Sequence, residues 1–359
     1  MNIDVYRKLA KRLDAIPNGF PETKSGVELK ILAKLYTPEE AKLASELRLT
    51  LESAEQIAQR TNQDLATTKK TLESMLQRGL IRSAGKEEQL KYALMPWVVG
   101  IYEAQIDTMD EELAHLFEEC YQTFAEQVLS QEPSIHKVIP VEKSVPVEVQ
   151  VFPYEQASML LEKANSFGVL KCVCRVQKSL IGEPCEYPVE VCLVFSPSEE
   201  AFKDSSTIRA ITKEEASQIL QETEEFGLVH SSANIREGQF YICNCCPCCC
   251  GIMRGVSQFG IENSVAKSDF YATVDSEACI GCGVCLERCH FNAPSLEEGK
   301  SSVDRRRCFG CGLCVATCPS GAIKLVRKPE NQISPTPANR EEWMKERAKK
   351  RGISLQEIL

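Results

Sequence analysis

Cysteine is the residue type whose spacing in this sequence points most directly to chemistry. Of the 19 cysteines, eight lie between residues 279 and 318 in two runs, and each run has the spacing C-x2-C-x2-C-x3-C. Thiolates are soft ligands that bind zinc and iron–sulfur clusters, and close spacing lets one loop wrap around a metal group. The first run consists of Cys279, Cys282, Cys285 and Cys289, and the second of Cys308, Cys311, Cys314 and Cys318.

The two runs, the second of them followed by Pro319, resemble the bacterial two-cluster ferredoxin family. The resemblance implies two [4Fe–4S] clusters, because in that family the fourth cysteine of each run ligates the cluster of the other run. It therefore places Cys318 with the first three cysteines of the first run, and Cys289 with the first three of the second. Zinc ribbons are the alternative, but they use paired C-x2-C units and not complete runs of four.

The residues around the two runs refine this expectation. His290 follows the first run where the family has proline, and since that proline binds no metal, ligation is expected to survive. The three arginines at 305–307 would either raise a cluster potential or receive an acidic partner, or simply be solvated. Glycines are expected to let the ligand loops turn and bring backbone N–H groups to the sulfurs, at Gly281, Gly283, Gly310 and Gly312.

Ten further cysteines lie between residues 150 and 252. Their two groups predict metal held between two halves of a module, as one or two more iron–sulfur clusters or, less favoured, zinc. Disulfides are one alternative, which a reducing cytosol and strain between adjacent cysteines oppose, and structural thiols are another. Side chains alternate along a strand, so a contiguous cysteine run supplies one site fully only from a loop. The ten are Cys172, Cys174, Cys185, Cys192, Cys243, Cys245, Cys246, Cys248, Cys249 and Cys250.

An internal repeat accompanies these cysteines. Residues 155–170, EQASMLLEKANSFGVL, align without gaps on residues 214–229, EEASQILQETEEFGLV. Each copy predicts an amphipathic helix that ends at Phe-Gly, followed by a strand, with second strands at 188–195 and 239–243. We therefore expect a duplicated αβ module with pseudo-two-fold symmetry. His230 lies beside the second copy and is interpreted as a hydrogen-bonded structural residue, with ligand or proton relay as alternatives.

The first 99 residues contain no cysteine and predict helices. Capping boxes begin at Thr37 and Ser53, and a helix, a turn, a helix and a β-hairpin with a charged tip at 85–88 follow one another. This order resembles a winged helix-turn-helix domain over residues 27–95, which implies DNA binding. The segment carries 11 lysines and arginines against 10 acidic residues, however, and DNA readers need a basic surface. Docking to another protein is therefore favoured over DNA binding as the use of this segment.

Residues 100–131 predict one long helix with an apolar stripe, which packs either on the wing domain or on a second copy of the chain. Cys120 lies on this stripe and is interpreted as a core residue. Residues 133–150, with three prolines and valines at 145, 147 and 149, predict a linker that enters a strand. Near the C-terminus, a proline-bearing linker and a charge-rich helix at 339–350 are expected, the helix being solvated.

The whole chain of 359 residues, with 43% hydrophobic content and a net charge of −9, predicts a multidomain α+β protein without bulk affinity for nucleic acid or membrane. No segment predicts a membrane span or secretory signal, so a cytoplasmic location is expected. The predicted parts are a winged-helix-like domain (1–99), a linker or dimerisation helix (100–132), the duplicated cysteine-rich α+β module (133–265), the dicluster ferredoxin domain (266–328), and a linker with terminal helix (329–359).

These expectations combine into an electron-transfer protein that serves a redox partner or a larger oxidoreductase complex. Nucleotide-binding glycine motifs are absent from the sequence, so no substrate site stands out and a stand-alone enzyme is not favoured. The alternative is a redox-responsive DNA-binding regulator, in which cluster state would move the N-terminal helices. The near-neutral charge of the winged-helix-like segment 27–95 counts against this regulator.

Overall fold

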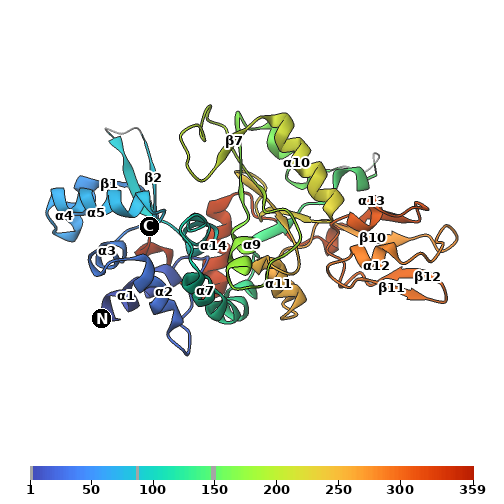
Figure 1. Cartoon of the computed structure of the whole chain (residues 1–359), viewed down its shortest axis with the longest axis horizontal. Helices are drawn as coiled ribbons and strands as arrows, with labels where there is room; N and C mark the ends of the chain where they lie inside the picture. Colours follow the sequence, from blue (N-terminus) through green and yellow to red (C-terminus); the bar gives the residue numbers. More distant parts are fainter. Residues whose placement is uncertain (1–2, 86–88, 147–150) are drawn as a thin grey trace. The chain divides into compact units, whose positions relative to one another are not determined.

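The computed structural model describes residues 3–85, 89–146 and 151–359. The chain forms two compact units, and each is described by itself. The first unit contains Met1–Gln131, Val176–Pro184 and Met344–Leu359, and the second contains Glu132–Arg175 and Cys185–Trp343. Figure 1 colours both units along the sequence. No helix in the described part of the chain has the length and apolar character that crossing a bilayer requires.

The first unit is mainly helical. Both predicted capping boxes are present: Thr37 with Glu40 begins one helix, and Ser53 with Gln56 begins another. A three-stranded sheet has the order β1-β3-β2. The strands are β1 (Glu52–Ser53), β2 (Ile81–Ala84) and β3 (Lys91–Leu94), and the helices are α1 (Ile3–Asp14), α2 (Val27–Leu35), α3 (Pro38–Ala44), α4 (Ala54–Thr61), α5 (Leu65–Gln77), α6 (Tyr102–Ala104), α7 (Glu111–Phe124) and most of α14 (Arg340–Arg351).

The prediction of one helix over residues 100–131 is wrong. The short helix α6 ends at Ala104, and α7 begins only at Glu111, because the side chain of Asp110 accepts a hydrogen bond from the backbone N–H of Leu113 and caps a new helix. A π-helical turn, η3 (Ala125–Leu129), extends α7. The apolar stripe of α7 packs on α2 of the same unit, and Cys120 is buried there as expected. A homodimer through this stripe stays a prediction.

The terminal helix α14 is solvated on one face only, and its other face is buried, which the sequence did not predict. Arg347 is fully buried, and its guanidinium donates hydrogen bonds to the carbonyl oxygens of Pro17, Val128 and Gln131 at 2.8, 2.6 and 2.7 Å. These backbone acceptors satisfy the donors of a side chain that would otherwise be costly to bury. Arg347 therefore fixes the terminal helix inside the first unit.

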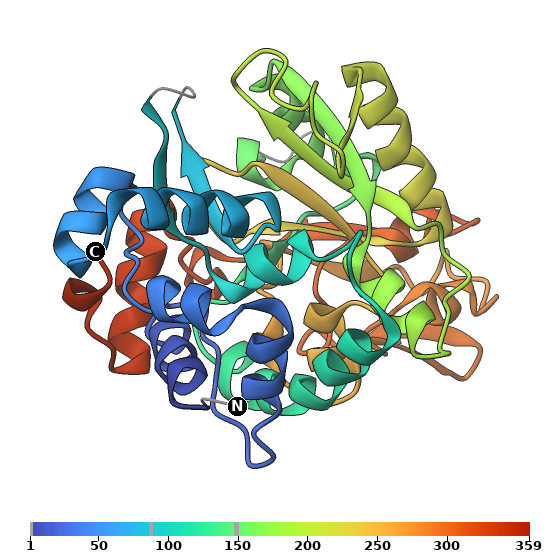
Figure 2. The same cartoon turned by 60° about the vertical axis from the view of Figure 1, so that its left-hand side comes forward.

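The second unit is built on a six-stranded antiparallel sheet with the order β4-β8-β9-β6-β5-β7. Helices α8 (Ala157–Glu162) and α10 (Lys213–Phe226) cover an apolar core that includes Val169, Leu193 and Leu220. Figure 2 shows α10 running alongside the long strands. The strands are β4 (His136–Val138), β5 (Ser166–Lys171), β6 (Glu190–Ser196), β7 (Arg209–Ile211), β8 (Val229–Ala233) and β9 (Tyr241–Cys245), and α11 (Gly251–Ser257) follows β9. Helix α9 (Val173–Leu180) begins in this unit after β5, and its residues from Val176 on belong to the first unit.

Both copies of the predicted repeat contain the expected pair of strands, but only the second copy has the expected helix end. In the second copy Gly227 ends α10 in the left-handed conformation, as predicted. In the first copy α8 already ends at Glu162, and Gly168 lies within β5, where a Cβ atom would overlap the side chain of Ile208. The common Phe-Gly helix end is therefore wrong for the first copy. The pairs β5–β6 and β8–β9 nevertheless meet through β6 and β9 at the centre of the sheet.

The linker predicted over residues 133–150 contains a strand of its own, β4, which pairs with β8. Its side chains are buried, so this segment belongs to the sheet. Two other predicted features lie outside the described residues: the tip of the N-terminal hairpin at 86–88, and the valines at 147 and 149 of the linker.

The C-terminal part of the second unit begins and ends in paired strands. β10 (Phe270–Val274) pairs antiparallel with β13 (Ile323–Arg327), so the two ends of this module are joined. Between them lie α12 (Val284–Arg288), the hairpin of β11 (Pro294–Glu297) and β12 (Lys300–Val303), and α13 (Leu313–Ala316). Figure 1 shows these elements in orange to red. Their small core contains Phe270 and Leu325 together with cysteine side chains.

Candidate metal centres

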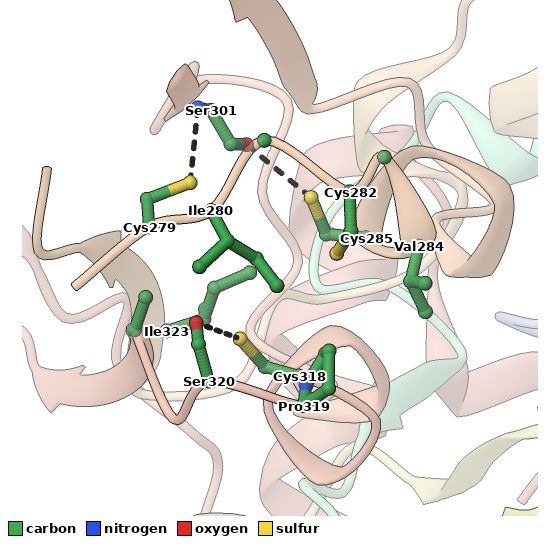
Figure 3. A pocket seen from close by; sticks show the side chains of 13 residues that line it. Cys279, Ile280, Cys282, Val284, Cys285, Ser301, Cys318, Pro319, Ser320 and Ile323 are labelled. Carbon is green, nitrogen blue, oxygen red and sulfur yellow. Dashed lines mark hydrogen bonds between the residues drawn. The ribbon is translucent and has the colours of Figure 1, made fainter. Parts of the chain in front are cut away.

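A pocket in the C-terminal module gathers cysteines from both predicted runs. Figure 3 shows Cys279, Cys282 and Cys285 from the first run facing the same space as Cys318 from the second. The backbone N–H of Ser301 lies 3.4 Å from the sulfur of Cys279, and its hydroxyl lies 3.3 Å from that of Cys285. The pKa of Cys279 is lowered, first by this N–H group of Ser301. Such donors favour the thiolate, which is the form that binds metal.

The other expected ligands also lie together. The thiol of Cys311 interacts electrostatically with Cys289 and Cys308, and burial raises its pKa to about 12. The backbone N–H of Ala272 lies 3.4 Å from the sulfur of Cys308. The structure thus brings the fourth cysteine of each run to the first three of the other run, which is the arrangement that two cubane clusters need.

The ligand loops turn at glycines with positive φ. All four glycines singled out in the sequence have φ angles between 68° and 80°. At Gly281 a Cβ atom would overlap the carbonyl oxygen of Gly299, and at Gly310 it would overlap that of Phe270. Both loops therefore require glycine for two reasons, the backbone conformation and the close approach of neighbouring backbone.

Six of the middle cysteines form a closed series of neighbouring thiols, which we call the thiol ring. Each thiol interacts with the next, and the last returns to the first. The sulfurs of Cys245 and Cys250 are 3.3 Å apart. Cys192 and Cys243 come from the adjacent strands β6 and β9, and Cys172 and Cys174 from the start of α9. In order, the ring is Cys172, Cys174, Cys250, Cys245, Cys243 and Cys192.

The remaining four middle cysteines form a second group, the thiol quartet: Cys185, Cys246, Cys248 and Cys249. Their sulfurs all lie within 4.8 Å of one another. The cysteine-rich run after β9 is thus shared between two sites, since Cys245 belongs to the ring and Cys246 to the quartet. The division begins where β9 ends, since Cys245 is the last residue of the strand, and the loop that follows it supplies Cys248 and Cys249 to the quartet and Cys250 to the ring.

Arg175 lies between the ring and the quartet. It is only 2% exposed and interacts electrostatically with Cys246 in the quartet and with Cys172 and Cys192 in the ring. Its guanidinium donates to the carbonyl oxygens of Pro188 at 2.7 Å and Asn244 at 2.8 Å. Burial lowers the pKa of Arg175, but the thiols outweigh burial and the net pKa is raised. The sequence showed this arginine beside Cys174 without indicating its position between two thiol groups.

Two buried histidines border these groups. Nδ1 of His230 hydrogen-bonds to Oδ1 of Asn244 at 2.5 Å, and its Nε2 lies 3.4 Å from Glu224, which agrees with a structural role. Nδ1 of His136 lies 3.2 Å from the hydroxyl of Ser231, and that hydroxyl lies 3.6 Å from the sulfur of Cys245. Burial lowers the pKa of His136 to about 4, so this ring is neutral near pH 7.

The C-terminal module docks on the cysteine-rich sheet through residues next to Cys289. Arg288 donates hydrogen bonds to the carbonyl oxygens of Glu224 and Glu225 at the end of α10. His290 interacts electrostatically with Cys246 of the quartet. A side chain adjacent to an expected cluster ligand thus lies near the second thiol group.

The comparison with known families bears on the C-terminal module. Residues 272–325 match the 4Fe-4S dicluster domain. The chain therefore contains an iron–sulfur domain of the ferredoxin type near its C-terminus, and the close cysteine group in the middle adds to its metal-binding character. No curated protein matches the chain. The thiol ring and quartet lie outside the matched residues.

Two cations at the candidate recognition helix of the N-terminal unit are already paired with carboxylates. Lys69 of α5 forms an ion pair with Glu55 at 2.7 Å, and Arg78 forms one with Glu40. Because these carboxylates already neutralise the two cations, the helix presents less positive charge than its sequence contains.

Proposed function

We propose that this chain is an electron-transfer protein with two [4Fe–4S] clusters in its C-terminal module and a third iron–sulfur cluster in the thiol ring. The eight cysteines of the two runs would hold the first pair, with Cys318 and Cys289 exchanged between the runs. When bound, such clusters exchange single electrons. A separate redox protein, or a larger oxidoreductase complex, would be the partner.

The closed ring of six thiols is the observation that carries this proposal beyond the dicluster domain. Cys172, Cys245 and Cys250 are buried, while the other three are partly buried, so the group is shielded from water. Four thiolates suffice for a cubane, and the two extra thiols leave room for a larger cluster.

A chain of neighbouring residues between the ferredoxin-type module and the thiol ring supports an electron relay. Cys289 is followed directly by His290, which interacts with Cys246, and Cys246 follows Cys245 of the ring. The protein's own part is to hold the thiolates, exclude water and place positive charge beside them. Arg175 supplies that charge within the middle module. This continuity supports electron passage between the two modules.

Iron and acid-labile sulfide counts on the anaerobically purified full chain test the proposal. We expect about twelve sulfides per chain, eight from the dicluster domain and four or more from the ring. A triple variant with Cys192, Cys243 and Cys245 each replaced by serine leaves only three ring thiols and should lower the sulfide count to about eight, while the control Cys120→Ser, at a buried thiol outside both groups, should not change it. A wild-type count of about eight sulfides would show that the ring holds no iron–sulfur cluster.

For the N-terminal unit we retain the winged-helix interpretation of residues 27–95 as a proposal, with protein docking as its use. The succession of α4, α5 and the β2–β3 hairpin supports it. The ion pair between Lys69 and Glu55 counts against the DNA-binding alternative. Electrophoretic mobility of random duplex DNA at low salt tests this: we expect no shift, and a salt-sensitive shift would favour the regulator.

A further inference from the structure

The thiol quartet differs in geometry from every other cysteine group in the chain. The sulfurs of Cys185 and Cys246 are 3.9 Å apart, and those of Cys248 and Cys249 are 3.7 Å apart. All four sulfurs lie within 4.8 Å of one another, and no other group of metal-binding side chains in the described residues is as compact.

These distances are those of one shared metal ion. Thiolates at about 2.3 Å from a tetrahedral ion lie about 3.8 Å from one another, which is close to both measured separations. In a cubane each thiolate binds a different iron, so the ligand sulfurs lie farther apart. The C-terminal module provides an internal reference, because its eight expected cubane ligands do not form such a compact group among the described residues.

We propose that the thiol quartet binds a single thiophilic divalent cation, zinc or ferrous iron, in a tetrahedral site that contains no inorganic sulfide. This site is separate from the thiol ring, and the assignment does not depend on the proposed electron relay. Two of the quartet's cysteines, Cys246 and Cys249, are buried, whereas Cys248 is exposed and gives an ion a route into the site.

The surroundings suit an anionic tetrathiolate. Four thiolates around a divalent ion carry a net charge of −2, and the buried guanidinium of Arg175, which interacts electrostatically with Cys246, offsets part of it. Tyr187 and Leu228 cover the buried side of the group. Cys185 comes from its own loop, and the other three cysteines follow β9. The ion would therefore tie the loop holding Cys185 to the turn after β9.

Metal and sulfide analysis of the full chain tests this assignment. Cys248→Ser alters the exposed member and Cys249→Ser a buried one, with Cys120→Ser as the control. We expect both quartet variants to lose about one metal ion per chain while acid-labile sulfide stays unchanged. Loss of zinc and loss of iron both support a mononuclear site, and elemental analysis tells the two apart. Circular dichroism checks folding, and the exposed Cys248 is the member least able to disturb it.

Two results would overturn the assignment. One is loss of about four irons together with four sulfides, which would make the quartet a cubane site. The other is an unchanged metal content in both folded variants. Where the ion is zinc, X-ray absorption at the zinc edge adds a direct test, since four sulfurs at about 2.3 Å without a metal–metal distance are expected at the quartet. Failure of the relay would appear instead in the wild-type sulfide count, so the two proposals fail separately.

Discussion

The imidazole of His290 donates a hydrogen bond from Nε2 to the carbonyl oxygen of Gly227, at a distance of 2.5 Å. Gly227 is the residue that ends α10, so a side chain of the ferredoxin-type module caps a helix of the cysteine-rich module. Arg288 reaches the same helix end, and a Cβ atom at position 227 would collide with its guanidinium. His290 stands where the ferredoxin family has proline, and its side chain docks the ferredoxin-type module on the cysteine-rich module.

Replacing His290 by alanine should loosen this docking without removing metal. His290 is not a ligand, so iron and sulfide contents should match the wild type. Loss of one hydrogen bond at the end of α10, worth about 1 kcal/mol, should speed amide exchange there roughly fivefold. Hydrogen exchange measured on peptides covering residues 220–230 is the readout. The exposed His115→Ala serves as control, and iron loss in His290→Ala would contradict a purely docking role.

A buried ion pair should contribute more to stability than an exposed one. Lys137 Nζ lies 2.6 Å from a carboxylate oxygen of Asp269, with side-chain exposures of 7% and 4%. Asp269→Ala leaves a buried ammonium group without its carboxylate, which should cost about 3 kcal/mol. The midpoint of anaerobic thermal unfolding should then fall by about 6–12 °C. In the matched control, Glu200→Ala breaks an exposed pair with Lys203 and should leave the midpoint unchanged. Equal effects of both variants would contradict this prediction.

Features encoded by neighbouring residues could be predicted from the sequence. The capping boxes at Thr37 and Ser53 are found because each depends on residues only three positions apart. The two cysteine runs were recognisable for the same reason, and residues 272–325 match a dicluster domain. The break before α7 also has a local cause, the cap at Asp110, which the apolar stripe across 100–131 concealed.

Features that depend on distant contacts could not be predicted. The burial of Arg347 depends on backbone carbonyls more than two hundred positions away in the sequence. From the sequence alone, its charge therefore predicted exposure to solvent. The partition of the middle cysteines needed the pairing of β6 with β9, which sets Cys192 beside Cys243. Cys185 joins the quartet from a separate loop, and no local spacing reveals that contact.

His136 should make the protein less stable at mildly acidic pH. Its pKa is lowered from 6.5 to about 4 by burial, so the folded protein resists a proton that the unfolded chain accepts. The stabilising contribution is complete above pH 6.5 and is lost as pH falls toward 4. Between pH 7 and pH 5.5 the loss is about 1 kcal/mol.

The thermal midpoint of His136→Gln should therefore depend less on pH than that of the wild type, by about 2–4 °C over this interval. Measurement at both pH values, with cluster absorbance followed in parallel, gives the difference between the two proteins. His115→Gln, at an exposed position, should behave like the wild type. A wild-type pH dependence in His136→Gln would assign the effect to other groups.

Arg175 should tune the potential of a cluster bound in the thiol ring. Its buried positive charge interacts with Cys172 and Cys192 and stabilises the reduced, more negative state of such a cluster. Arg175→Met removes that charge while keeping much of the side-chain volume, so the reduction potential should fall by roughly 50–100 mV. Anaerobic redox titration followed by electron paramagnetic resonance measures the shift. Arg306→Met is the control, because that side chain is 89% exposed and solvent screens its charge. A larger shift in Arg306→Met than in Arg175→Met would mean that the arginines before the second cysteine run, and not the buried one, set the measured potential.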